Sequence, residues 1–232
     1  MQSVKRLDRL VLFEIVWDKA SACWLSIAKS CFSTLFICLT LFGAANVNAT
    51  FCPEYTGRGL DYTNPENQGR LDSIADVHFT EDVRMLRRGS TTYLARDIEY
   101  LLNWSPNHHQ ALAALTRLAL REGKTTPDRA RVDLECRFLW ARKTQPRDAM
   151  VLVIQGSYYS RAGRFEEAKK TLKEAARMAP ENPEINYNLG LALYNLEDYE
   201  SARSYARKAY NGGYPLPGLR NMLERAGYPL SD

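Results

Sequence analysis

The sequence predicts an all-α fold, a solenoid of helical hairpins with an irregular N-terminal arm and a C-terminal capping helix. The C-terminal half repeats itself with a period of about 34 residues. Apolar side chains recur there at helical spacing rather than in alternation. Hydrophobic residues make up 45% of the 232 residues and charged residues 25%, which is the balance of a globular protein.

The repeat is seen when residues 149–182 are aligned with residues 183–216. Gly156 then coincides with Gly190, in the middle of the first predicted helix of each unit. Glycine costs about 1 kcal/mol relative to alanine in a helix, so equivalent glycines indicate that a second helix approaches closely. Pro183 separates the units because proline begins helices but does not continue them.

This spacing of glycine, alanine and aromatic residues resembles the tetratricopeptide repeat (TPR). The resemblance implies units of two helices that stack side by side. It also implies that the first helices of successive units line a concave groove, the surface with which such arrays bind partners.

The TPR-like helical domain is expected to span residues 76–232. A degenerate repeat is expected at about 107–148, with an insertion around 124–128 between its two helices. Residues 216–226 predict a closing helix, because repeat arrays need a polar end. Residues 50–75 are rich in Gly, Asn and Asp, which favours turns, so they are predicted to form an irregular arm that packs on the helices.

Residues 1–49 predict a secretory signal peptide. An uncharged apolar run from Cys31 to Val47 follows Lys29, and a small-residue pattern ends at Ala49, so cleavage is predicted after Ala49. The expected location is the periplasm or the exterior. The alternative is an uncleaved anchor in the inner membrane, and the long leader leaves open a true start further along.

Two cysteines remain after the predicted leader, Cys52 and Cys136. In an oxidising compartment such a pair favours a disulfide. This bond would tie the arm to the helices and, by closing a long loop, contribute about 4 kcal/mol on the chain-entropy account. The alternative is that Cys136 is a buried thiol and Cys52 is free.

Motifs for catalysis or for binding metals are missing from the sequence. It has three histidines, His78, His108 and His109, and no HExxH, paired CxxC, GxSxG, P-loop or GxGxxG. No enzymatic activity, cofactor or metal site is therefore predicted. A net charge of +4, from 31 basic and 27 acidic residues, gives no basic face for nucleic acid.

The predicted functional surface is the concave groove. Tyrosine rings offer area, amides pair with a peptide backbone, and an arginine can meet a carboxylate. The candidate residues are Val153, Ser157, Arg161, Tyr187, Asn188, Leu191, Tyr194 and Asn195, with Ser160 beside them. The alternative for Tyr187 and Tyr194 is a place in the core of the stack.

Short motifs along the chain resemble a group of exported Gram-negative bacterial TPR proteins of unassigned function. They are Asp61-Tyr62-Thr63-Asn64, His78-Phe79-Thr80, Asp97-Ile98-Glu99-Tyr100, Pro106-Asn107-His108-His109 and the runs 187–191 and 214–219. The resemblance implies a periplasmic or secreted protein and no known reaction. The chain departs from the group in its long leader and its Arg87-Arg88 turn.

The sequence therefore predicts a non-catalytic adaptor or scaffold of the bacterial envelope that binds a peptide or helix of another protein in its groove. No nucleic acid is expected as partner, and a membrane only if the N-terminal segment is uncleaved. The alternative is a permanent structural or assembly subunit of an envelope complex. A further alternative is a metal-binding protein or an enzyme.

Overall fold

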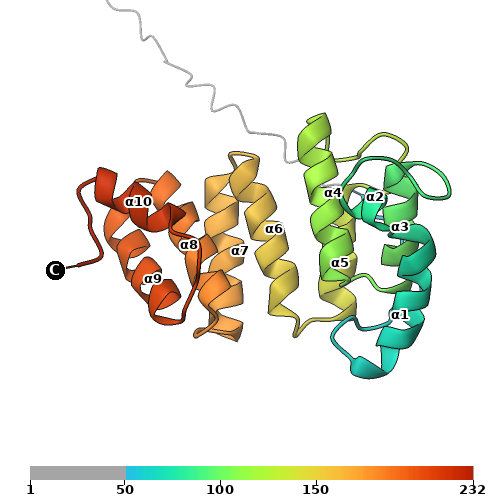
Figure 1. Cartoon of the computed structure of the whole chain (residues 1–232), viewed down its shortest axis with the longest axis horizontal. Coiled ribbons are helices and arrows are strands. Elements are labelled where there is room, and N and C mark those ends of the chain that lie inside the picture. The colour runs from blue at the N-terminus through green and yellow to red at the C-terminus, as the bar shows by residue number, and fades with distance from the viewer. Residues whose placement is uncertain (1–50, 232) are drawn as a thin grey trace, which may run out of the picture. The chain divides into compact units, whose positions relative to one another are not determined.

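The computed structural model describes residues 51–231, and these residues form helices and loops without a strand (Figure 1). The predicted signal peptide at 1–49 lies outside the described residues. The helices of the described part are α1 Pro65–His78, α2 Glu81–Arg84, α3 Leu94–Trp104, α4 His109–Glu122, α5 Leu134–Thr144, α6 Ala149–Arg161, α7 Phe165–Met178, α8 Pro183–Asn195, α9 Tyr199–Asn211 and α10 Gly218–Arg225. The predicted all-α hairpin solenoid is confirmed.

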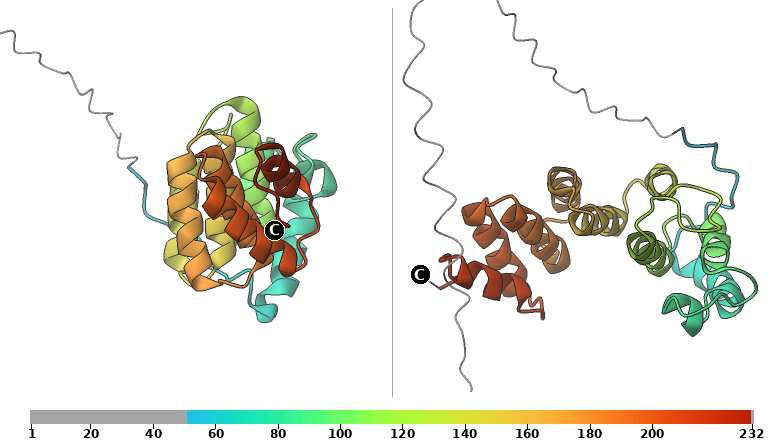
Figure 2. Two further views of the ribbon diagram at one scale, coloured as in Figure 1. Left: turned by 90° about the vertical axis from the view of Figure 1, so that its left-hand side faces the viewer. Right: turned by 90° about the horizontal axis from the view of Figure 1, so that it is seen from above.

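The C-terminal half consists of two helical pairs followed by a cap. Helix α6 packs on α7, α8 packs on α9, and α7 also contacts α8, so one pair continues into the next. The right-hand view of Figure 2 shows this succession as the colour of the chain passes from yellow to red. The close approach expected at Gly156 is present, because a methyl group added there would stand 2.5 Å from Leu172 Cγ of α7.

Helices α4 and α5 form the preceding pair, and a long connection separates them. Helix α4 ends at Gly123, which adopts the left-handed conformation with φ 65° that favours glycine. The connection closes at Asp133, whose side chain caps α5 by accepting a hydrogen bond from Glu135 N at 2.8 Å. The expected insertion thus leads directly into the second helix of this pair.

The prediction for the N-terminal arm is wrong over part of its length. An irregular segment is expected at 50–75, but α1 begins at Pro65. The side chain of Asn64 accepts a hydrogen bond from Glu66 N at 3.0 Å, and Pro65 takes the first helical position, where its missing N–H costs nothing. Asparagine followed by proline is a signal for a helix start, and the glycine-rich composition concealed it. The described irregular arm is 51–64.

A continuous apolar core runs through these helices, from Leu71 of α1 to Leu223 of α10. A smaller cluster at the junction of α6, α7 and α8 includes Ala175 and Ile185, which are fully buried. Helix α10 contacts both α8 and α9 and covers the last pair. The core therefore holds the first helices of successive pairs in fixed register, and this register builds the groove.

Candidate functional site

A groove of about 470 Å³ lies along the first helices α4, α6 and α8. Arg117 and Leu120 of α4 form one side, and Tyr214 and Leu216 after α9 close the other. The direct packing of α6 on both α4 and α8 keeps the three helices adjacent. The groove therefore draws on three successive helical pairs rather than on the two regular repeats alone.

Most of the predicted groove residues lie together in this cavity. They are Val153, Ser157, Arg161, Tyr187, Asn188 and Leu191, and Ser160 lies with them. The side chain of Val153 is buried, that of Leu191 is half-buried and that of Arg161 is exposed. The groove accordingly offers both apolar area and an accessible cation.

Tyr194 and Asn195 lie at the end of α8 and do not line the groove. The ring of Tyr194 packs edge-on against Tyr199, with centroids 5.2 Å apart. The Asn195 amide is exposed and donates to the carbonyl of Leu191 at 2.8 Å. The ring of Tyr194 thus faces the start of α9 and the Asn195 amide faces solvent, so the structure does not bring these two predicted residues together with the others.

Polar side chains connect α6 and α8 across the floor of the groove. Ser157 Oγ donates to Asn188 Oδ1 at 3.0 Å, and Asn188 Nδ2 donates to the carbonyl of Glu184 at 2.9 Å. Tyr187 is 7% exposed and stacks on Tyr214 with centroids 4.1 Å apart. Tyr187 therefore forms a rigid wall of the groove, and Asn188 is ordered before a ligand arrives.

The groove carries an excess of positive charge. Arg117 and Arg161 line it, and Glu184 is the carboxylate among the lining residues. Arg117 Nη2 donates to the carbonyl of Arg84 at 2.7 Å, which fixes the guanidinium. Burial, followed by repulsion from Arg161, lowers the pKa of Arg117. Arg117 was not predicted because the candidate residues came from the two regular repeats. The sequence does carry a signal for it, since aligning Gly123 with Gly163 places Arg117 on Ser157.

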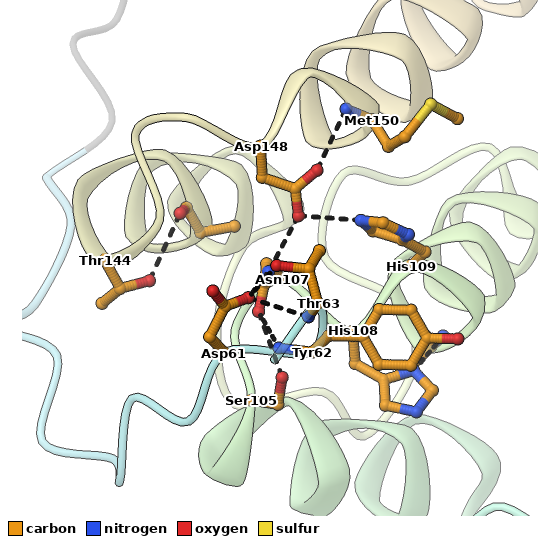
Figure 3. Close-up of polar contacts among 12 residues, drawn as sticks. Asp61, Tyr62, Thr63, Ser105, Asn107, His108, His109, Thr144, Asp148 and Met150 are labelled. Carbon is orange, nitrogen blue, oxygen red and sulfur yellow. Dashed lines mark hydrogen bonds and ion pairs between the residues drawn. The ribbon is translucent and has the colours of Figure 1, made fainter. Parts of the chain in front are cut away.

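A separate polar cluster joins the N-terminal arm to α4 and α6 (Figure 3). At its centre the buried Asn107 donates from Nδ2 to Asp61 Oδ1 and to Asp148 Oδ2, both at 2.8 Å. Asn107 Oδ1 accepts from Tyr62 N at 2.9 Å. His109 Nε2 lies 2.8 Å from Asp148 Oδ2. Two of the motifs that carry the family resemblance thus meet in one cluster.

The acids of this cluster are held in their charged form. Burial alone would raise the pKa of Asp148, but hydrogen bonds from His109 and Asn107 outweigh it, so the pKa lies below its usual value. Asp61 behaves in the same way, with Thr63 N and Asn107 as its main donors. Their hydrogen bonds are made with one another, which indicates a structural junction.

His108 and Tyr62 pack against each other beside the cluster, with ring centroids 4.3 Å apart. His108 is 5% exposed and caps α4 by accepting a hydrogen bond from Ala111 N at 3.3 Å. Burial lowers the pKa of His108 to about 4. This imidazole is therefore neutral at pH 7 and serves as a buried cap.

Cys52 and Cys136 are joined by a disulfide, with their Cα atoms 5.3 Å apart. Trp140 Nε1 donates to the carbonyl of Pro53 at 3.0 Å, and Tyr55 OH donates to the carbonyl of Asn103 at 2.8 Å. The backbone N–H groups of Arg58 and Leu60 donate to the carbonyls of Asn103 and Trp104 at 2.8 and 2.9 Å, so the disulfide and several hydrogen bonds hold the arm on α3 and α5.

A buried ion pair lies between the same two helices. Arg137 Nη2 is 3.0 Å from Glu99 Oε1, and both side chains are 3% exposed. Arg137 also donates to Asn103 Oδ1 at 2.7 Å. Glu99 accepts from Arg131 N and Val132 N at 3.0 and 3.1 Å, which secures the long connection before α5.

Residues 51–231 contain neither a membrane-spanning helix nor a metal-binding cluster. No helix in this range is both long and apolar enough to cross a membrane. No three His, Cys, Asp or Glu side chains in it gather closely enough to hold a metal ion.

Comparison with known proteins agrees with the helical pairs. Residues 155–216 match the tetratricopeptide repeat model. The solved structure of Pseudomonas aeruginosa pilF is similar to this chain: it is 19% identical, has a TM-score of 0.50, and the match covers 70% of this chain and 71% of that one. At this identity the likeness shows the fold. No curated protein matches the chain. The match lies within the helical pairs described above, so residues 155–216 of this chain form tetratricopeptide repeats.

Proposed function

We propose that the protein is a non-catalytic adaptor that binds an extended segment or a helix of another protein in the groove along α4, α6 and α8. Tetratricopeptide repeats in general bind other proteins. The observation that carries the proposal is the convergence of Ser157, Arg161, Asn188 and Leu191 in one open groove lined by three first helices. These side chains offer hydrogen bonds, charge and apolar area at the same place.

The lining of the groove favours a partner segment of a particular kind. Leu120, Leu191 and Leu216 offer apolar contacts. Arg117 and Arg161 are two cations against one acid, and a guanidinium binds a carboxylate through paired hydrogen bonds. A segment with an acidic side chain next to apolar ones fits this lining.

The proposed location is the bacterial envelope, outside the cytoplasm. The Cys52–Cys136 disulfide supports it, because disulfides persist in oxidising compartments and are rare in the cytosol. The apolar stretch within residues 1–49, which has the composition of a signal peptide, supports it independently. A bacterial periplasm meets both conditions.

Affinity capture with charge-matched variants tests the function. Arg117→Gln/Arg161→Gln removes both groove cations. Lys143→Gln/Lys170→Gln removes two exposed lysines of α5 and α7 that lie outside the groove. The proteins captured from the native periplasm by the wild type should persist with the lysine variant and fall about tenfold or more with the arginine variant.

The melting temperature of each variant shows whether the fold survives, since Arg117 also binds the carbonyl of Arg84. The groove is not the binding surface if the folded arginine variant captures the same proteins at the same level. A partner lost equally from both variants would also contradict the proposal, because net charge rather than the groove would then decide capture.

A further inference from the structure

The second helices of the repeats form another pocket, of about 250 Å³, which shares no lining residue with the groove. Its polar lining comes from α7, α8 and α9, which meet where the first regular repeat passes into the second. The polar side chains are Lys173, Arg177, Asn186, Tyr205 and Lys208. The pocket thus combines three cations, one phenol and one amide.

The cations of this pocket lack counterions among the described residues. Lys173 and Arg177 are four residues apart on α7, a spacing at which like charges repel. The ammonium of Lys208 lies 5.2 Å from the centre of the Tyr205 ring. No carboxylate lines the pocket, and no ion pair in residues 51–231 involves these three cations.

The acid on the same stretch of α7 is already occupied. Glu174 accepts hydrogen bonds at 2.8 and 2.9 Å from Arg142 of α5. Because this carboxylate is held by another helix, it does not serve as counterion for Lys173 or Arg177. The positive charge is therefore available to an anion from solution.

Asn186 gives the pocket a second, independent feature. The side chain is 1% exposed, and Nδ2 donates to the carbonyls of Pro180 and Asn182 at 2.9 and 3.0 Å. Its Oδ1 atom is buried and has no hydrogen-bond partner. A buried acceptor without a donor costs free energy, so a ligand donor at this place would be stabilising.

We propose that this pocket binds a phosphate ester that carries a neighbouring hydroxyl group, such as glycerol phosphate, either free or as a lipid headgroup. A phosphate monoester carries a charge of about −1.5 to −2 and three acceptor oxygens, which suits two ammonium groups and a guanidinium. A single carboxylate would neutralise one of the three cations. The hydroxyl supplies the donor that Asn186 Oδ1 lacks.

Calorimetric titration of the purified protein with glycerol 3-phosphate tests the free form of the ligand. Lys173→Gln/Arg177→Gln/Lys208→Gln should weaken binding by about tenfold or more, because it removes every cation of the pocket. The control Lys170→Gln removes an exposed lysine of α7 that does not line the pocket, and it should bind like the wild type. Methyl phosphate lacks the hydroxyl and should bind about fivefold more weakly than glycerol 3-phosphate.

Flotation tests the lipid form with phosphatidylcholine vesicles that contain lysophosphatidic acid, whose headgroup is a phosphate monoester beside a free hydroxyl, compared with vesicles of phosphatidylcholine alone. Binding to the lysophosphatidic acid vesicles that the triple variant loses and Lys170→Gln keeps assigns the headgroup as the source of the phosphate. The proposal is overturned if neither glycerol 3-phosphate nor these vesicles bind, or if Lys170→Gln weakens binding as much as the triple variant. Equal affinity for methyl phosphate would overturn the assignment of the hydroxyl to Asn186.

Discussion

The two halves of the helical unit are stabilised in different ways. Buried polar side chains concentrate in the N-terminal half, at Asp97, Glu99, Ser105, Asn107, His108, Thr116 and Arg137. The regular repeats bury Gln155, Thr171 and Asn186, and otherwise pack small and aliphatic side chains with a few tyrosines. Irregular helices are thus joined by specific polar contacts, and repeated helices by close packing. Substitutions of each kind should therefore have different costs in the two halves.

The largest effect is expected at the buried ion pair of the N-terminal half. Arg137→Met leaves Glu99 buried without its cation, and the free energy of unfolding should fall by about 3–5 kcal/mol. Arg142→Met is the matched control, because the Arg142 and Glu174 side chains are each 39% exposed. Its cost should be about 1 kcal/mol or less. Urea unfolding measures both, and equal costs would show that the buried pair does not hold this half together.

In the C-terminal half, the packing of Leu219 on Gly190 should contribute about as much stability as the buried ion pair does in the N-terminal half. Leu172 fills the space over Gly156, whereas Ala206 holds the equivalent place in the next repeat. Leu219 of the cap fills that space instead, since a methyl group on Gly190 would stand 2.5 Å from Leu219 Cδ2. Leu219→Ala should therefore cost about 3 kcal/mol.

A second substitution sharpens this comparison of the repeats. Ala206→Leu restores a leucine at the place that Leu172 occupies in the preceding unit. In the Leu219→Ala background it should recover about half of the lost stability, and in the wild type it should destabilise by overpacking. If the effects of Leu219→Ala and Ala206→Leu on the free energy of unfolding simply add in a double-mutant cycle, a leucine at position 206 does not fill the space left by Leu219.

The N-terminal half should respond to acid before the repeats do. Burial lowers the pKa of His108 from 6.5 to about 4. The unfolded chain thus binds the proton more readily than the folded protein does. Well above pH 6.5 neither state is protonated at His108 and the free energy of unfolding is unaffected, whereas it decreases as the pH falls toward 4. The loss should approach about 3 kcal/mol.

His108→Asn separates the effect of His108 protonation from other effects of acid, because asparagine also caps helices but does not titrate. The variant should be less stable at pH 7, since it lacks the ring that packs on Tyr62. Its unfolding free energy should change less than that of the wild type between pH 6.5 and 4. Parallel pH profiles for the two proteins would exclude His108 as the source of acid sensitivity.

The smallest effect is expected at the turn within each repeat. Gly163 adopts φ 75°, and Glu197 adopts φ 60° at the equivalent turn of the next unit. A side chain in this left-handed region is strained, so Glu197→Gly should stabilise the protein by about 1 kcal/mol. Gly163→Ala should destabilise it by a similar amount. Thermal unfolding that moves both variants in one direction would contradict the equivalence of the turns.

The regular repeats were predictable because their contacts recur along the sequence. Gly156 and Gly190 are 34 residues apart in the same sequence pattern, so a single alignment predicts both pairs of helices and most of the groove. The arm was harder to predict, since its contacts join residues without any period. Asp61 of the arm and Asn107 are 46 residues apart, and neither position signals the other. Tyr194 has the helical phase of a groove residue, and only packing against Tyr199 turns it away.

The central claim is that the protein binds another protein through the groove along α4, α6 and α8. A photoreactive amino acid placed at Ser157, inside the groove, tests it most directly in living cells. The same amino acid at Lys170, exposed on α7, is the control. We expect a discrete cross-linked partner from position 157 and none from position 170. Cross-links from position 170 alone, or an identical set from both positions, would contradict the claim.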